Sequence, residues 1–169
     1  MTMLLAEPLT AAAFKPFGEV IALGSVPPLS INEGRCRRYT DLAHLDVAEG
    51  RVGLSLFQAE IRGVPLPVGL LERHPLGSQA FLPLGGSECL VVVAPDIGGR
   101  PGDPVAFHAR ADQGVNYARG TWHGVLAPIS GSGLFAVVDR IGAGANLEEV
   151  RLNPGLRISL PRRETLARP

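Results

Sequence analysis

The sequence has no excess of either charge and no long apolar run, and each absence argues against a class of protein. Sixteen Lys and Arg balance sixteen Asp and Glu, so the strongly positive field on which nucleic-acid binding relies is missing. No stretch reaches the roughly 18 apolar residues of a membrane span, and the N-terminus lacks the basic segment of a signal peptide. We therefore expect a cytoplasmic protein that binds neither nucleic acid nor a membrane.

Cysteine is also scarce. Cys36 and Cys89 are the two cysteines of the chain, and they match no metal or redox spacing. We expect both to be free thiols in a reducing compartment, with Cys89 in the core because it opens the apolar run CLVVVA. The balanced charge leaves self-association permitted.

Glycine and proline, by contrast, are abundant, with 21 and 15 in 169 residues. Together with apolar runs broken at short intervals, they favour many short strands joined by turns. Thr10 followed by AAAF predicts a short, N-capped helix. The length predicts a single domain over residues 1–169 with a flexible tail at about 161–169. We expect a mainly β fold closed into a barrel or sandwich.

Residues able to carry chemistry gather in LERHPLGSQAFLPLGG, which spans residues 71–86. In an extended segment Glu72 and His74 point to the same face. Gln79 on the next strand and His123, from ARGTWHGVL, could meet them inside a small barrel. Two nitrogen and two oxygen ligands suit a divalent ion such as nickel, zinc, iron or manganese. Taken singly, each residue has a purely structural explanation, such as packing of His123 on Trp122.

Two further groups of charged residues have competing interpretations. Arg35, Arg37 and Arg38 lie in a segment rich in Pro, Gly and polar residues, which is either a solvated loop or an anion-binding loop, since guanidinium groups match carboxylates. Asp139 and Arg140 end the apolar run LFAVVDR, where we expect a structural pair rather than a catalytic one.

The spacing of the site residues resembles the two motifs of the cupin superfamily. The first motif has His, any residue, His, four residues, Glu, six residues and Gly, and its positions fall here on Glu72, His74, Gln79 and Gly86. The second has Pro, any residue, Gly, two residues and His, and its positions fall on Ala118, Gly120 and His123. Glu72 thus replaces a His and Gln79 replaces a Glu. The resemblance implies a cupin-like antiparallel β-barrel of the jelly-roll type.

At a finer level the chain resembles the ureidoglycolate lyases, also called ureidoglycolate hydrolases, of allantoin and purine breakdown. The segments that carry this resemblance are PLTAAAFKPFGEVI, INEGRCRRYTDLA, LERHPLGSQAFLPL, LVVVA, DQGVNYARGTWHG and AVVDR. It implies cleavage of (S)-ureidoglycolate to glyoxylate and urea by a homodimer, with nickel as an associated cofactor. One departure is Gly124, where many relatives carry a second His after His123.

This reaction suggests roles for the polar residues. His74 or His123 would act as the base and Glu72 would orient it, or Glu72, His74, Gln79 and His123 would hold a metal that binds the carboxylate and hydroxyl of the substrate. The substrate carboxylate would pair with Arg119, or else with Arg38. The candidates for binding the ureido group are Tyr117, Asn116, Asn32 and Glu33; the alternative for both asparagines is a role in shaping turns.

Two other functions remain open on the sequence. The chain could be a non-catalytic cupin that binds a small organic acid, in which case it would show affinity without turnover. It could also be another metal-dependent cupin enzyme, such as a dioxygenase or a sugar isomerase.

Overall fold

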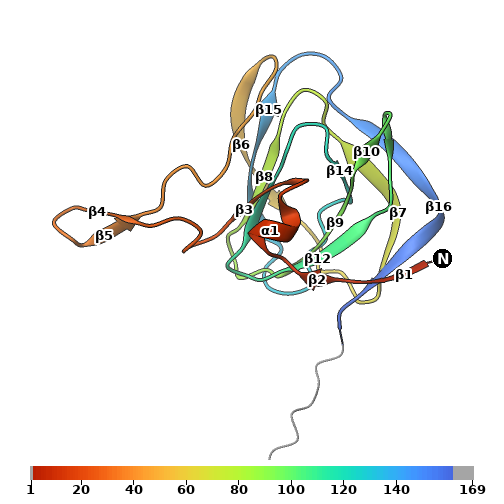
Figure 1. The fold of residues 1–169 in the computed structure, drawn as a ribbon, viewed down its shortest axis with the longest axis horizontal. Helices are drawn as coiled ribbons and strands as arrows, with labels where there is room; N and C mark the ends of the chain where they lie inside the picture. The colour runs from red at the N-terminus through yellow and green to blue at the C-terminus, as the bar shows by residue number, and fades with distance from the viewer. Residues whose placement is uncertain (1, 162–169) are drawn as a thin grey trace, which may run out of the picture.

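Two β-sheets face each other and enclose the interior of the protein in the computed structural model, which describes residues 2–161 (Figure 1). The first sheet has the strand order β1 (Thr2–Leu5), β16 (Glu148–Ser159), β7 (Leu66–Arg73), β14 (Trp122–His123), β9 (Cys89–Ala94), β12 (Val105–Ala109) and β2 (Glu7–Pro8). The second has the order β3 (Gly18–Ile21), β13 (Gly114–Tyr117), β8 (Gln79–Pro83), β15 (Leu134–Ile141) and β6 (Arg51–Gln58). Two hairpins, β4 (Leu29–Ile31) with β5 (Cys36–Arg38) and β10 (Asp96–Ile97) with β11 (Arg100–Pro101), complete the fold.

The alternation of side chains along β9 explains its unbroken apolar sequence. Val91 and Val93 point into the space between the sheets, where Phe81 and Val137 of the opposite sheet meet them. Leu90, Val92 and Ala94 point the other way, into a second buried cluster. Because β9 is buried on both faces, no polar residue interrupts it. As expected, Cys89 lies in the core as a free thiol.

The one helix within residues 2–161, α1 (Ala11–Phe14), closes one end of the barrel. The Thr10 hydroxyl caps it by accepting a hydrogen bond from the amide of Ala13 at 3.2 Å. Phe14 is fully buried and makes an edge-on contact with Phe107. The prediction of a mainly β, cupin-like barrel with a short N-terminal helix is confirmed.

The antiparallel pattern has two exceptions at the edges of the seven-stranded sheet. β1 pairs in parallel with β16, and β2 pairs in parallel with β12. No helix in residues 2–161 is long and apolar enough to cross a membrane. The predicted flexible tail falls, apart from Pro161, outside the described residues.

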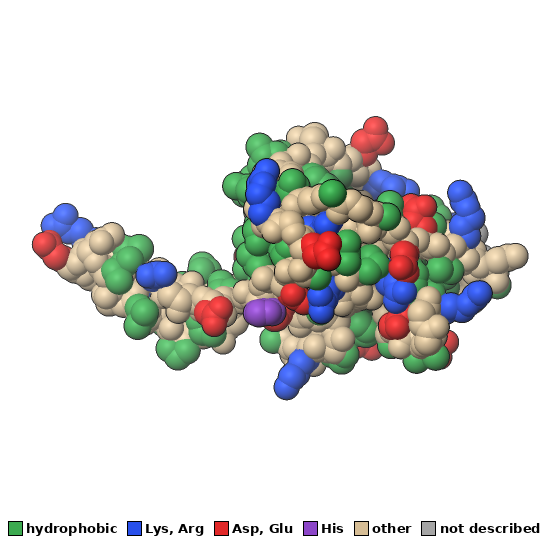
Figure 2. Space-filling model, turned by 90° about the horizontal axis from the view of Figure 1, so that it is seen from above, with side chains coloured by type: hydrophobic (Ala, Val, Ile, Leu, Met, Phe, Trp, Pro, Cys, Tyr) green, Lys and Arg blue, Asp and Glu red, His purple; other side chains and the backbone are tan. Residues whose placement is uncertain are grey.

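The hairpin β4–β5 stands away from the barrel as an arm (Figures 1 and 2). All six residues of its two strands are exposed. The chain then returns to the barrel, where the carbonyl of His44 accepts a hydrogen bond from Asn116 and the amide of Asp46 donates one to Ser78. The segment with the three arginines is thus an ordered hairpin rather than a loop.

Candidate active site

The sheet register brings the residues of the first motif and His123 together. Glu72 near the end of β7 is the direct cross-strand partner of His123 in β14, so both side chains lie on the same face of the sheet. His74 follows β7, and its ring centroid lies 5.3 Å from that of His123. The potential ligand atoms of Glu72, His74 and His123 all lie within 4.8 Å of one another.

The opposite sheet contributes Gln79 and Tyr117, which are cross-strand partners in β8 and β13. Tyr117 stacks on His123, with ring centroids 4.2 Å apart and planes 1° apart. Gln79 lines the same pocket as Glu72 and His74. The four residues of the expected metal set therefore meet between the two sheets.

Hydrogen bonds to backbone carbonyls leave the same ring nitrogen of each histidine free. Nδ1 of His74 lies 2.7 Å from the carbonyl oxygen of Asn146, and Nδ1 of His123 lies 3.1 Å from that of Gly124. A carbonyl only accepts, so each Nδ1 donates, and in the neutral ring Nε2 keeps its lone pair. Both Nε2 atoms are buried without a hydrogen-bond partner.

Burial controls the charge of the site. The pKa of His123 is lowered to about 4, mainly by the loss of water on burial; the hydrogen bond to Gly124 raises it, and the neighbouring His74 lowers it. His123 is therefore neutral at pH 7. Burial also raises the pKa of Glu72, and His74 partly offsets that rise.

The free atoms of the site match the donors that a divalent metal uses. Besides the two histidine nitrogens, Oε1 of Gln79 is buried and lacks a hydrogen-bond partner. Glu72 supplies a carboxylate beside them. Two imidazole nitrogens and two oxygens form a set suited to a borderline divalent ion, so the side chains fit a metal centre.

The pocket beside these residues is an open cleft of about 490 Å³, a volume typical of small-molecule sites. Its apolar wall includes Phe57, Phe81 and Leu147. Among the described residues that line it, none is Lys or Arg.

Comparison with known proteins decides the family. The family model described as ureidoglycolate lyase matches residues 1–159. The chain belongs to the ureidoglycolate lyase family.

Curated relatives with that name match most of this chain and most of their own length. A ureidoglycolate lyase from Rhodobacter capsulatus is 56% identical over 90% of this chain and 95% of its own. One from Chelativorans sp. is 48% identical over 96% of this chain and 100% of its own. The solved TDP-quinovose 3,4-ketoisomerase from Campylobacter jejuni aligns at a TM-score of 0.37 and 16% identity, covering 75% of this chain and 88% of its own.

Two residues of this ureidoglycolate lyase family member hold site side chains in place by hydrogen bonds, and the sequence did not predict this role for either. Asp139 accepts a hydrogen bond from Nε2 of Gln79 at 3.3 Å, which leaves the Gln79 oxygen as the free atom. The backbone carbonyl of Asn146 accepts a hydrogen bond from Nδ1 of His74, and the side-chain oxygen of Asn146 accepts one from the amide of Leu76 at 2.7 Å. The sequence contained a signal for Asp139: two residues apart on a strand, Asp139 and the buried Val137 share one face, which points inward.

The expected pair of Asp139 and Arg140 does not form. Neighbours on a strand point to opposite faces, and the Arg140 guanidinium donates to the carbonyls of Glu49 and Ala143.

The remaining predicted residues of this family member lie in three places. Asn116 is fully buried on the other face of β13 from Tyr117, and its amide donates to Glu19 and to the carbonyl of His44. Arg119 is partly exposed and pairs with Asp46 at 3.2 Å. The arm carries the others, which are Asn32, Glu33 and Arg38.

Gly124 does not leave a gap in the ligand set. A Cβ atom at this position would lie 3.4 Å from Val92 and 3.9 Å from Val68, and both belong to or pack on the second apolar cluster. A side chain there would thus point away from His123 and the pocket.

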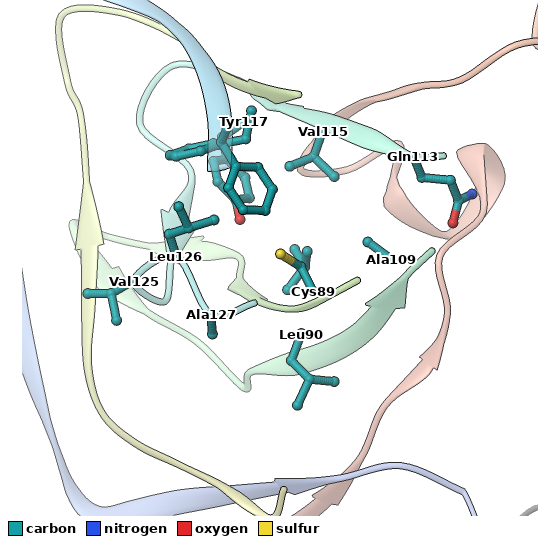
Figure 3. A pocket seen from close by; sticks show the side chains of 12 residues that line it. Cys89, Leu90, Ala109, Gln113, Val115, Tyr117, Val125, Leu126 and Ala127 are labelled. Atoms are coloured by element: carbon teal, nitrogen blue, oxygen red, sulfur yellow. The ribbon is translucent and has the colours of Figure 1, made fainter. Parts of the chain in front are cut away.

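A second, small cavity of about 20 Å³ lies beside Tyr117 and Cys89 (Figure 3). Figure 3 shows the Cys89 sulfur among apolar side chains, with Gln113 at one end. This volume holds no more than a water-sized molecule. Burial raises the pKa of the Cys89 thiol to about 12, so the thiol is unreactive at neutral pH.

Proposed function

We propose that this protein is an enzyme that cleaves (S)-ureidoglycolate to glyoxylate and urea in the cytoplasm, as a step of allantoin and purine breakdown. The observation that carries the proposal is the match of residues 1–159 to the ureidoglycolate lyase family. The pocket supports it, because His74 lines a cleft of suitable size and its Nε2, like that of the neighbouring His123, is buried without a hydrogen-bond partner.

The reaction requires two proton movements around one carbon atom. The hydroxyl of ureidoglycolate loses its proton as the bond between that carbon and the ureido nitrogen breaks. The hydroxyl oxygen becomes the aldehyde oxygen of glyoxylate, and the departing nitrogen receives a proton to give urea. A single group that accepts the first proton and returns it to the nitrogen satisfies both needs.

We assign this proton transfer to Nε2 of His74. The carbonyl of Asn146 holds the opposite ring nitrogen and so fixes the orientation of the ring. His123 is a poor proton acceptor at neutral pH because burial lowers its pKa to about 4. Its neutral Nε2 is suited to contacting the substrate hydroxyl, and Glu72 lies beside both histidines.

If the pocket instead holds a metal, we propose nickel, and Glu72, His74, Gln79 and His123 are the residues that would hold it. A bound divalent ion would make a coordinated hydroxyl more acidic and fix the substrate carboxylate. Nε2 of His74 cannot hold an ion and accept a proton at once, so metal dependence and a His74 base are exclusive assignments.

We further propose that the barrel belongs to the cupin superfamily and that the working unit is a homodimer. The motif spacing and the two facing sheets support the first point. The exposed apolar side chains on the outer face of the five-stranded sheet support the second. Substrate contacts by Arg119, Asn32 and Glu33 stay predictions. The Asn116 amide donates to Glu19 and to the carbonyl of His44 on the other face of β13, and Tyr117 stacks on His123.

Purified protein tests the proposed function directly. Incubation with (S)-ureidoglycolate should release urea and glyoxylate in equal amounts. Binding of ureidoglycolate without turnover would identify a non-catalytic acid-binding protein, and oxygen consumption would identify a dioxygenase.

A further inference from the structure

The proposed substrate is an anion, yet no cationic side chain from residues 2–161 lines the pocket. The described residues that line it include Glu72 and His74 but neither Lys nor Arg, and Asp139 lies directly behind Gln79. Arg119, the first candidate for the carboxylate, is partly exposed and already pairs with Asp46. Since carboxylates are bound best by guanidinium groups, residues 2–161 of one chain leave a pocket for ureidoglycolate without a partner for the substrate carboxylate.

The outer face of the five-stranded sheet is apolar where water would favour polar side chains. Leu54 and Leu56 on the edge strand β6 are 73% and 67% exposed. Their cross-strand partners on β15 are Val138 and Ala136, and the row continues from Ala136 to Leu82 on β8. This continuous apolar surface is typical of an interface.

The arm carries a second apolar surface. Leu29 pairs with Arg38 and Ile31 pairs with Cys36, so these four side chains share one face of the hairpin. The opposite face carries Ser30 and Arg37. A two-stranded hairpin alone in water is marginally stable, and the space-filling view shows hydrophobic side chains along this arm without cover from the barrel (Figure 2).

We propose that a second copy of this chain covers both surfaces: the arm of one protomer lies on the outer face of the five-stranded sheet of the other, and its Arg38 completes the other's pocket. This proposal rests on the proposed function for its ligand. In a two-fold dimer the contact between arm and sheet occurs twice, so the apolar surfaces of both protomers are buried. The net charge of zero produces no repulsion against such a contact.

The position of β6 connects the two parts of the proposal. Its outward residues Leu54 and Leu56 form the apolar surface, while Phe57 on its inward face lines the pocket. An arm on this strand therefore passes beside the pocket opening. Arg38 shares the docking face of the arm, whereas Arg37 faces solvent. The negative groups at the pocket, Glu72 and Asp139, complement the guanidinium of Arg38.

Oligomeric state tests the surface without any substrate. We expect sedimentation velocity to give a dimer for the wild type and a monomer for Leu54→Asp, with unchanged circular dichroism because Leu54 is exposed in the single chain. The control is Val105→Asp, which replaces another exposed apolar residue on β12 and should leave the dimer intact. A monomeric wild type, or a dimeric Leu54→Asp, overturns the proposal.

Mixed dimers test whether Arg38 acts on the other protomer. Arg38→Ala and His74→Ala chains with different tags are produced together, and dimers carrying both tags are purified. If Arg38 acts across the interface, one pocket of each mixed dimer has both residues, and activity should be about half that of the wild type. Inactive mixed dimers overturn the proposal. Arg37→Ala, the solvent-facing control, should keep wild-type activity.

Failure of the proposed function would be distinguishable. If the wild type does not turn over ureidoglycolate, the same variants are titrated with glyoxylate, whose carboxylate probes the pocket directly. Weaker binding in Arg38→Ala than in Arg37→Ala supports the arm contact, and equal binding overturns it.

Discussion

The ring of Tyr117 lies flat on that of His123, with centroids 4.2 Å apart and planes 1° apart. Tyr117 also contacts Phe81 and Phe14 through its ring, so it joins the histidine to the aromatic core. Burial raises the pKa of the Tyr117 hydroxyl, and the group is neutral at all physiological pH values. The stacked pair fixes the His123 ring, which its strand alone would leave free to rotate.

Tyr117→Ala should therefore destabilise the protein and misplace His123. We expect a loss of about 3 to 5 kcal/mol in the free energy of unfolding, as for other buried aromatics. Tyr117→Phe keeps the ring and should keep both stability and kcat near wild type. Urea denaturation and steady-state kinetics measure the two effects. A fully folded but inactive Tyr117→Phe would instead show that the hydroxyl contacts substrate.

The pH dependence of stability should report the buried His123. Its pKa is about 4 in the folded protein against an ordinary value of 6.5, so the unfolded chain binds more protons between these values. The resulting stability is present above about pH 6.5 and lost as pH falls through about 4. It amounts to about 3 kcal/mol. Denaturation of chelator-treated wild type and His123→Gln from pH 4 to 7 should show a flatter curve for the variant; parallel curves would contradict the shift.

Glu72→Gln should separate stability from function. Burial raises the pKa of Glu72, so the folded protein holds its charge at a cost at pH 7. The neutral variant should be at least as stable as wild type in thermal denaturation at pH 7, while its turnover of ureidoglycolate falls about tenfold or more. A clearly less stable variant would mean that the carboxylate makes a stabilising contact.

Asp139→Ala should weaken metal binding although Asp139 is not itself in the ligand set. Without its hydrogen bond, the Gln79 amide loses a fixed orientation, and such supporting contacts are worth about 10- to 100-fold in metal affinity. Competition with a chromogenic chelator measures nickel, zinc and manganese affinities. The matched control is Asp112→Ala, an exposed residue paired with Arg110. Equal affinities in both variants would remove Asp139 from the site.

The sequence predicted what depends on local pattern. The two-residue repeat of an extended strand predicted that Glu72 and His74 share one face. The motif around His123 predicted that the second imidazole lies beside them, as it does. Thr10 predicted the helix because capping is a local contact. The apolar run CLVVVA predicted a buried strand, and β9 is buried on both faces.

What the sequence left open depends on tertiary register. Asn116 and Tyr117 are neighbours with equal claims from sequence, yet only Tyr117 contacts His123, because strand parity puts Asn116 on the other face. Asn146 reaches His74 across 72 positions, a contact that no local pattern encodes. The arm was interpreted as a loop because its prolines and glycines obscure the short hairpin ladder.

Turnover by three purified proteins tests the central claim, that His74 works in a ureidoglycolate-cleaving pocket. The wild type should release urea and glyoxylate from (S)-ureidoglycolate, and His74→Ala should do so at least about a hundredfold more slowly. His108→Ala, whose histidine pairs with Glu88 outside the pocket, should match the wild type. An inactive wild type would contradict the function, and an unchanged rate in His74→Ala would contradict the site.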